Sequence, residues 1–226
     1  MALDANTQLL FHITPIVIGF IIMMPFGEAL AAKLATKFPS LTTARGRLLG
    51  GMKLVMLGGF TVSVHTFWIH NKAKELGAGE FCSGESLFDC SSVIGNDAWN
   101  TMPVIGLPWG VIGMIAFAVF MWLIISISKE PNATWVVQHI KIGKVMGILG
   151  LVMMLYLFYA EFSIGKLCQY CTVAHLAHAI TTFGFFRLEN MFESNGWNTT
   201  KAAPTGKRQA RRPKRGFVPP IPSEEE

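Results

Sequence analysis

Charged residues are scarce in this chain. Asp, Glu, Lys and Arg make up 15% of its 226 residues, whereas hydrophobic residues make up 51%. A soluble globular chain typically carries about 25% charged residues. The deficit argues against an ordinary water-soluble domain and indicates that lipid is the solvent around much of the chain.

Long polar stretches are also few, because apolar stretches take up most of the chain. A helix needs about 20 mostly apolar residues to cross a hydrocarbon core of about 30 Å. The sequence therefore predicts an all-α integral membrane protein with five spans, at residues 9–32, 48–69, 104–127, 142–162 and 168–186. The residues between these spans are too few for a large soluble domain, such as a fused thioredoxin-like domain.

Basic residues are absent ahead of the first apolar stretch. A secretory signal begins with a basic region and has a shorter apolar core than residues 9–32. We therefore expect this stretch to be a retained span that precedes the other four.

Acidic residues are absent from 33–47, which carries two lysines and two arginines. Residues 128–144 hold three lysines against one glutamate, whereas 70–103 holds five acidic residues against two lysines. Cytoplasmic loops carry the excess of Lys and Arg. We therefore expect a plasma-membrane protein with 33–47, 128–144 and the C-terminal tail in the cytoplasm, and with the N-terminus and the 70–103 loop outside.

This topology brings all four cysteines to one face of the membrane, although the cysteines were not used to derive it. Cys82 and Cys90 lie in the outer loop. Cys168 and Cys171 follow the turn between the fourth and fifth spans, which faces the same side. That side is the oxidising one, where disulfides form and persist.

Cys168-Gln169-Tyr170-Cys171 is a Cys-x-x-Cys motif at the expected start of a helix. The spacing lets the two sulfurs close a small ring, and a helix N-terminus stabilises the thiolate that attacks during disulfide exchange. The motif favours redox chemistry. Half of a metal site and an inert structural pair are the alternatives.

Cys82 and Cys90 lie in a polar loop and could be a structural staple that closes it. Two pairs on one face, one of them on a loop that can swing, are what successive thiol–disulfide exchange requires. The alternative is a membrane metal-binding or transport protein in which the four cysteines, with His175, hold an ion such as zinc.

The order of these motifs resembles the vitamin K epoxide reductase family, including its bacterial and archaeal homologues. The resemblance covers residues 48–187. It rests on the spacing of Cys82 and Cys90, the following Ser91-Ser92-Val93, the Gly106-Leu107-Pro108 turn before a helix containing Gly113, and the final Cys168-Gln169-Tyr170-Cys171. Enzymes of the DsbB type, a different family with the same chemistry, place their quinone-side cysteine pair in the first outer loop. In this chain the loop pair comes first and the helix Cys-x-x-Cys last, so the order of the cysteines disfavours a DsbB-type enzyme.

The resemblance implies a fold, a function and a role for each cysteine. A four-helix bundle would surround a quinone of the menaquinone or ubiquinone type, with the extra N-terminal span beside it. Cys82 would take electrons from an extracytoplasmic thioredoxin-like protein of the DsbA type and pass them to Cys90. Cys90 would exchange with Cys168, and Cys171 would meet the quinone. The chain would thereby support disulfide bond formation.

Three residues depart from the family's pattern. Asn96 stands where members often have Ser, Trp109 where vertebrate members have Asn, and His175 where they have Tyr. These positions bear on how a quinone oxygen is held. The departures favour a simpler quinone over vitamin K epoxide, as in the prokaryotic branch, with Asn96 keeping a polar role.

Other residues are weaker candidates for quinone contact. An ionisable side chain within a span is a functional candidate, so His175 is expected at a quinone oxygen, with a histidine bonded to a neighbouring helix as the alternative. Phe88, Phe117 and Trp109 could line the pocket, although interfacial Trp is common without a ligand.

The chain therefore divides into three segments. Residues 1–47 hold the extra span and a basic loop, 48–187 the family-like four-helix domain, and 188–226 a basic tail. The tail has too few apolar residues to fold alone and is expected to be disordered. Its six basic side chains at 207–215 are expected to attract anionic lipid rather than nucleic acid.

Overall fold

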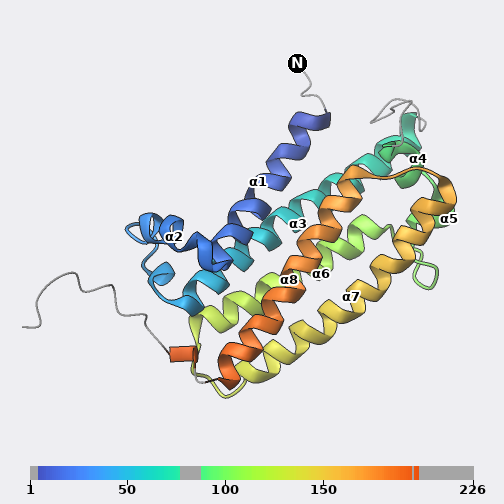
Figure 1. Cartoon of the computed structure of the whole chain (residues 1–226). Coiled ribbons are helices and arrows are strands. Elements are labelled where there is room, and N and C mark those ends of the chain that lie inside the picture. Colours follow the sequence, from blue (N-terminus) through green and yellow to red (C-terminus); the bar gives the residue numbers. More distant parts are fainter. Residues whose placement is uncertain (1–4, 77–87, 195, 199–226) are drawn as a thin grey trace, which may run out of the picture.

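The computed structural model describes residues 5–76, 88–194 and 196–198 (Figure 1). The helices are α1 (Ala5–Met23), α2 (Glu28–Leu34), α3 (Ala44–Leu76), α4 (Cys90–Ile94), α5 (Asp97–Asn100), α6 (Trp109–Lys129), α7 (Val136–Ile164) and α8 (Gln169–Glu193). Short 3-10 turns η1, η2 and η3 cover Pro25–Gly27, Pro39–Thr42 and Gly196–Asn198. Apart from two isolated bridges, these residues form no β-structure, which confirms the all-α class. Cys82 and the basic run 207–215 lie outside the described residues.

The long helices lie side by side in an elongated bundle (Figure 1). α3 contacts α1, α6 and α8, and α7 packs against α8. The interior is filled by large apolar side chains that include Met52, Phe120, Leu123 and Phe185, each fully buried. The short helices α4 and α5 lie at one end, with the start of α8, and we call this the cysteine end. α2 lies at the other end (Figure 1).

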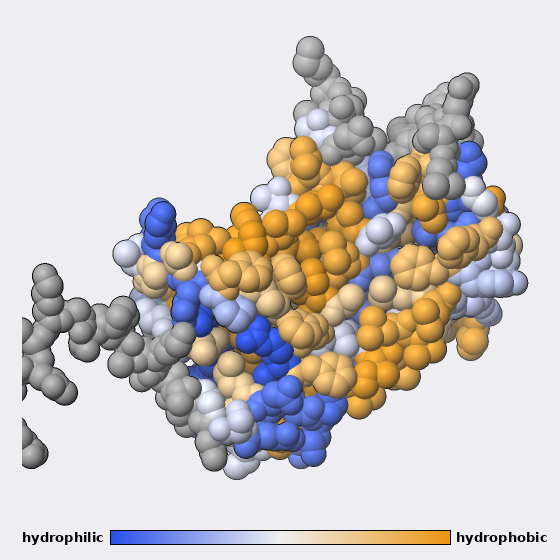
Figure 2. All heavy atoms as spheres, viewed as in Figure 1, coloured by the Kyte–Doolittle hydropathy of each residue, from blue (hydrophilic) through white to orange (hydrophobic). Residues whose placement is uncertain are grey.

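The surface of the bundle suits a bilayer. Figure 2 shows apolar side chains over the middle of the visible face and hydrophilic ones toward both ends of the bundle. Among the described residues, α3, α6 and α7 are each long and apolar enough to cross a membrane, and the bent pair of α1 and α2 counts as a fourth if it forms one span. The chain is therefore a membrane protein.

The prediction of five spans is not confirmed by helix length and composition, because α8 is not among these candidates. α8 is long enough, with 25 residues, but it is rich in polar side chains. His175, Thr181 and Thr182 are buried in the bundle. A membrane-spanning helix can bury polar side chains against other helices, away from lipid. Its mean hydropathy is then low even though the side chains that face lipid are apolar.

The first predicted span, 9–32, is wrong as one continuous helix. α1 ends at Met23, and the axis bends by 98° into α2. Pro25 has no N–H with which to continue the helix. Gly27 lies so close to the Ile21 carbonyl that any Cβ would collide with it, so the bend depends on a glycine at this position.

The third predicted span, 104–127, begins too early. α6 starts at Trp109, because Thr101 and Pro108 pair across a tight turn. The Gly106 N–H donates to the Met102 carbonyl at 2.8 Å, and Gly106 itself adopts a φ of 71°. That backbone conformation favours glycine.

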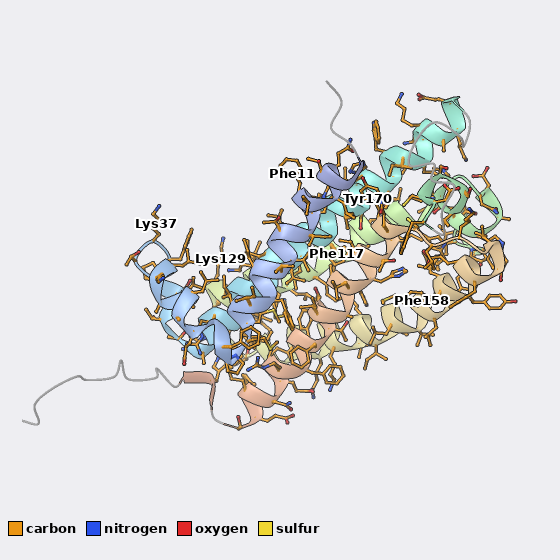
Figure 3. All side chains as sticks on the ribbon, turned by 45° about the horizontal axis from the view of Figure 1, so that its top comes forward. Phe11, Lys37, Phe117, Lys129, Phe158 and Tyr170 are labelled. Carbon is orange, nitrogen blue, oxygen red and sulfur yellow. The ribbon has the colours of Figure 1, made fainter. Side chains whose placement is uncertain are left out.

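The end of the bundle away from the cysteines is rich in cations. Arg47 forms an ion pair with Glu28 at 3.0 Å, and Lys144 forms one with Glu189 at 2.6 Å. Arg187 donates to the Met23 carbonyl at 2.8 Å and so ties α8 to the bend after α1. Figure 3 shows Lys37 and Lys129 toward this end as well.

Helix α1, which precedes the family-like domain, packs closely against α3. A Cβ on Gly19 would lie 2.5 Å from the Gly51 carbonyl oxygen, so the two backbones nearly touch. His12 adds polar contacts, with its Nδ1 3.1 Å from the Thr61 hydroxyl and its Nε2 2.9 Å from His65 Nδ1. The Thr61 hydroxyl donates to the Gly58 carbonyl, so it accepts from His12.

We expect Gly19→Val to displace α1 from α3. The new side chain meets backbone atoms that no rotamer change can move, and overpacking of this kind costs about 1–3 kcal/mol. The melting temperature of the protein in detergent should fall. Val17→Leu is the matched control, because Val17 lies on the same helix and is 45% exposed. Equal melting temperatures for both variants would contradict the tight α1–α3 contact.

Candidate active site

The turn between α7 and α8 sets the position of the Cys-x-x-Cys motif. Gly165 ends α7 with a φ of 71°. Its N–H donates to the Phe162 carbonyl at 3.2 Å, and the Lys166 N–H donates to the Glu161 carbonyl at 3.3 Å. This is the Schellman pattern, in which a left-handed residue closes a helix and reverses the chain. The reversal leads directly into Cys168.

Cys168 is the N-cap of α8. Its sulfur accepts a hydrogen bond from the Cys171 N–H at 3.2 Å, as an N-cap side chain does. Cys168 is fully buried, Cys171 is partly buried, and both are free thiols. Cys168 therefore lies at the N-cap and Cys171 in the first turn of a helix, where backbone N–H groups offset part of the cost of burying a thiolate.

Tyr170, between the two cysteines, anchors this turn to the bundle. It is fully buried and packs on the side facing α1 and α3 (Figure 3). Its ring centroid lies 4.7 Å from that of His65 and 6.3 Å from that of His12. Tyr170 thus anchors the start of α8 on the side of α1 and α3, and Cys171 faces the opposite side.

Cys90 is brought to Cys168 by a short backbone pairing. Phe88 forms a parallel bridge with Leu167, and the Asp89 N–H donates to the Leu167 carbonyl at 3.0 Å. Cys90 follows as the first residue of α4 and is 1% exposed. The Cys168 thiol contacts the thiols of both Cys90 and Cys171. The structure therefore brings three of the four predicted cysteines together, and Cys82 lies outside the described residues.

Asp89 holds the start of α4. Its carboxylate accepts from the Ser92 N–H at 3.1 Å and from the hydroxyls of Ser91 and Ser92 at 2.7 and 2.6 Å. Burial by itself raises the pKa of Asp89. The hydrogen bonds from Ser92 and Ser91, with the positive charge of Lys166, outweigh burial and hold the pKa below its usual range.

The cap formed by α4 and α5 is fastened to the bundle by polar contacts. Asn100 Nδ2 lies 2.8 Å from Nδ1 of the buried His70 on α3 and 2.6 Å from the Ile94 carbonyl oxygen. Trp109, the first residue of α6, donates from Nε1 to the Trp99 carbonyl at 3.0 Å. These bonds position the cap over a cavity in the bundle.

That cavity has a volume of about 180 Å³ and is lined by residues of α3 to α8. Its walls are mostly apolar or aromatic and include Trp99, Trp109, Phe117, Met153, Met154 and Leu157. A few polar side chains also line it, namely Asn100, Glu161, His175 and His178, together with Cys171. Apolar walls with a few convergent polar groups are typical of small-molecule sites.

Three of the five residues predicted to contact a quinone line this cavity: Trp109, Phe117 and His175. Phe117 is 3% exposed and lies inside the bundle (Figure 3). The other two, Asn96 and Phe88, are not among the lining residues.

The positions of Asn96 and Phe88 are explained by other contacts. The Asn96 side chain caps α5 by accepting from the Ala98 N–H at 3.1 Å. Phe88 is 52% exposed beside its bridge to Leu167. The geometry therefore gives no support to a contact of either residue with a ligand in the cavity.

Glu161 is the site residue that the sequence reasoning missed. It is 2% exposed, lines the cavity, and accepts at Oε1 from the Cys168 N–H at 3.2 Å. Among the described residues, its Oε2 atom and His175 Nδ1 are buried without a hydrogen-bond partner. A carboxylate seven residues before a Cys-x-x-Cys motif, within an apolar stretch, is the signal that could have identified it.

The comparison with protein families agrees with this arrangement. The model of the vitamin K epoxide reductase family matches residues 52–185, which is more than half of the chain. The chain belongs to the vitamin K epoxide reductase family. The match runs from α3 to α8 and contains all the cysteines. A comparison with curated proteins gave no match, and neither did a comparison with solved structures.

Membership of the vitamin K epoxide reductase family makes the chain a membrane oxidoreductase. In the described part of the chain, no three side chains among His, Cys, Asp and Glu are grouped in a way that could hold a metal ion. Cys82, which the metal-binding alternative needs, lies outside that part.

We expect Asp89→Ala to loosen α4 in this family member. Loss of an N-cap costs about 1 kcal/mol, so hydrogen-exchange protection of the amides of residues 92–95, which the Asp89 side chain and the turn of α4 hold, should fall roughly fivefold at neutral pH. Asp89 titrates lower in the folded chain than in the unfolded chain, where its pKa is about 3.9. Its contribution is therefore complete above about pH 4 and is lost as the pH falls through the folded value.

The control for this prediction is Asn96→Ala. Asn96 caps α5 as Asp89 caps α4 but carries no charge, so its loss should cost the same at every pH. The role assigned to the Asp89 carboxylate would be wrong if the effects of both variants depended on pH in the same way.

Proposed function

We propose that this family member is a quinone-dependent thiol–disulfide oxidoreductase that supports disulfide bond formation. The observation that carries the proposal is the sequence of contacts from Cys90 through Cys168 to Cys171. Cys90 lies in the cap, Cys168 contacts both other thiols, and Cys171 lines the apolar cavity. Thiol–disulfide exchange needs sulfurs in contact with one another, and these three are.

The proposed electron path begins at a thioredoxin-like protein outside the membrane. The thiols of that protein reduce the Cys82–Cys90 disulfide. The Cys90 thiolate then attacks the Cys168–Cys171 disulfide at Cys168, and the resulting Cys90–Cys168 bond is resolved by Cys82. Reduced Cys168 and Cys171 finally give two electrons and two protons to the quinone, and their disulfide forms again. Each exchange breaks one S–S bond and forms another.

The cavity suits a quinone ring. A bound quinone of the menaquinone or ubiquinone type supplies a two-electron acceptor. The aromatic side chains of Trp109 and Phe117 offer flat apolar walls, and His175 Nδ1 is buried without a partner among the described residues. A histidine N–H at this place can donate to a quinone oxygen, which would satisfy the buried nitrogen. Asn96 and Phe88 lie outside this set, because neither lines the cavity.

The proposed topology follows the charges. The cation-rich end of the bundle, with Arg47, Lys144 and Arg187, would face the cytoplasm, and the cysteine end would face outward. α8 would be a fifth span that buries its polar side chains in the bundle. The basic tail would contact anionic lipid in the cytoplasmic leaflet. In this arrangement the thioredoxin-like partner reaches the cysteines from the oxidising side.

We expect Cys171→Ala to abolish quinone reduction by the purified protein when a reduced thioredoxin-like partner is supplied. Without Cys171, Cys168 cannot form the disulfide through which electrons pass to the quinone, so electrons from the partner stop at the loop pair. In the variant as purified, before the partner is added, the Cys168 thiolate can instead attack the Cys82–Cys90 disulfide at Cys90 and release the Cys82 thiol. A Cys90–Cys168 disulfide should accumulate and be detected by mass spectrometry of alkylated peptides.

The matched control is Ser163→Ala, because Ser163 is exposed near the end of α7 and, within the described part of the chain, its hydroxyl bonds only to the Tyr159 carbonyl. It should leave quinone reduction unchanged. Normal quinone reduction by Cys171→Ala would overturn the proposed function. Stoichiometric zinc bound by all four thiols of gently purified protein would instead favour the metal-binding alternative.

A further inference from the structure

Glu161 is a buried carboxyl group placed directly against the redox pair. It belongs to the last turn of α7, it is 2% exposed, and its Oε1 accepts from the Cys168 N–H at 3.2 Å. Its Oε2 has no hydrogen-bond partner among the described residues. A buried polar atom without a partner is uncommon and calls for an explanation.

The surroundings of Glu161 provide thiols rather than a cation. Glu161 interacts electrostatically with Cys171, and both residues line the cavity with His175. α4 contributes Cys90 and Asp89 to the same region, and Lys166 interacts with Asp89. Within the described ranges, the ion pairs do not include Glu161. The carboxyl is therefore not held by a salt bridge.

The chemistry of the site requires a group that can accept a proton. Oxidation of Cys168 and Cys171 to a disulfide releases two protons, and the acceptor needs two protons to become a quinol. Thiolates rather than thiols react, so the Cys171 proton must leave before the electrons do. The walls of the cavity are largely apolar, so few side chains can take that proton.

We propose that Glu161 accepts the proton of the Cys171 thiol and passes it to the quinone oxygen. The proposal rests on the proposed function. The S–H bond of Cys171 breaks, its proton moves to Oε2 of Glu161, and the Cys171 and Cys168 sulfurs then form a disulfide as two electrons leave. Glu161 returns to a carboxylate when it releases its proton, and the Cys168 thiol provides the second proton of the quinol.

If Glu161 had only a structural role, that role would be the hydrogen bond that its Oε1 accepts from the Cys168 N–H. Glu161→Gln separates the two roles, because a glutamine amide oxygen can keep that hydrogen bond but cannot carry a proton. Glu161→Asp keeps a carboxyl group on a shorter side chain and should restore part of the proton transfer. Glu130→Gln, at the exposed end of α6, controls for the loss of one acidic residue.

The first measurement uses reduced protein without quinone. The rate of Cys171 alkylation, followed by mass spectrometry, should depend on pH in two steps for the wild type, because two interacting groups titrate together. Glu161→Gln should leave one step. In the reduced protein Cys171 and Glu161 share one proton, so part of the population carries it on Glu161, whereas in the oxidised protein Glu161 is a carboxylate. The infrared difference spectrum between the two states should therefore contain a carboxyl C=O band that Glu161→Gln lacks and Glu130→Gln keeps.

The second measurement is quinone reduction by pre-reduced protein in a single turnover. Positioned acid–base groups contribute about 10² to 10⁴ in rate, so Glu161→Gln should be slower than wild type by at least about tenfold. Reduction of the loop pair by the partner should be unchanged. Glu161→Asp should be intermediate.

The outcomes separate this proposal from the proposed function. If Glu161→Gln keeps both titration steps and the carboxyl band, Glu161 does not carry the proton, whatever the rate of quinone reduction by this variant. If Cys171→Ala reduces quinone as the wild type does, the proposed function fails without any reference to Glu161. Quinone reduction by Glu161→Gln at the wild-type rate would also overturn the proposal.

Discussion

The hydrogen bond from the Asp89 N–H to the Leu167 carbonyl joins the two halves of the candidate active site. The loop before α4 and the turn before α8 are separated by almost eighty residues, and this contact aligns them so that Cys90 meets Cys168. Buried backbone groups must be paired, so the contact also satisfies two polar groups at the end of the bundle. The Asp89 cap then directs α4 over the cavity.

The cavity beneath this junction combines two requirements that usually conflict. Under the proposed function, aromatic and aliphatic walls would favour an apolar ligand, whereas dithiol oxidation would need groups that can move protons. The cavity has both, because a few ionisable side chains, Glu161 and His175, line it together with Cys171. Two of the three buried polar side-chain atoms left without a partner in the described residues belong to these two side chains. The unsatisfied polar groups therefore gather where a ligand and the reacting thiols would meet.

Much of the architecture was predictable because bilayer thickness and charge bias act on local sequence. The apolar stretches around 48–69 and 142–162 became α3 and α7, each longer than predicted. Helix ends were less predictable. The bend after Met23 depends on Gly27 packing against Ile21, and the late start of α6 depends on the pairing of Thr101 with Pro108. The polar face of α8 is buried by its neighbours, which hydropathy cannot anticipate.

The sequence by itself determined the membrane class, the Cys-x-x-Cys motif at a helix start and the family, because these depend on composition and on short spacings. Tertiary structure alone decided which candidates surround the cavity. It placed Trp109, Phe117 and His175 there, used Asn96 as a helix cap, and turned Glu161 toward the cysteines. Such choices depend on contacts between segments far apart in the chain, so local patterns can nominate these residues but cannot place them around one cavity.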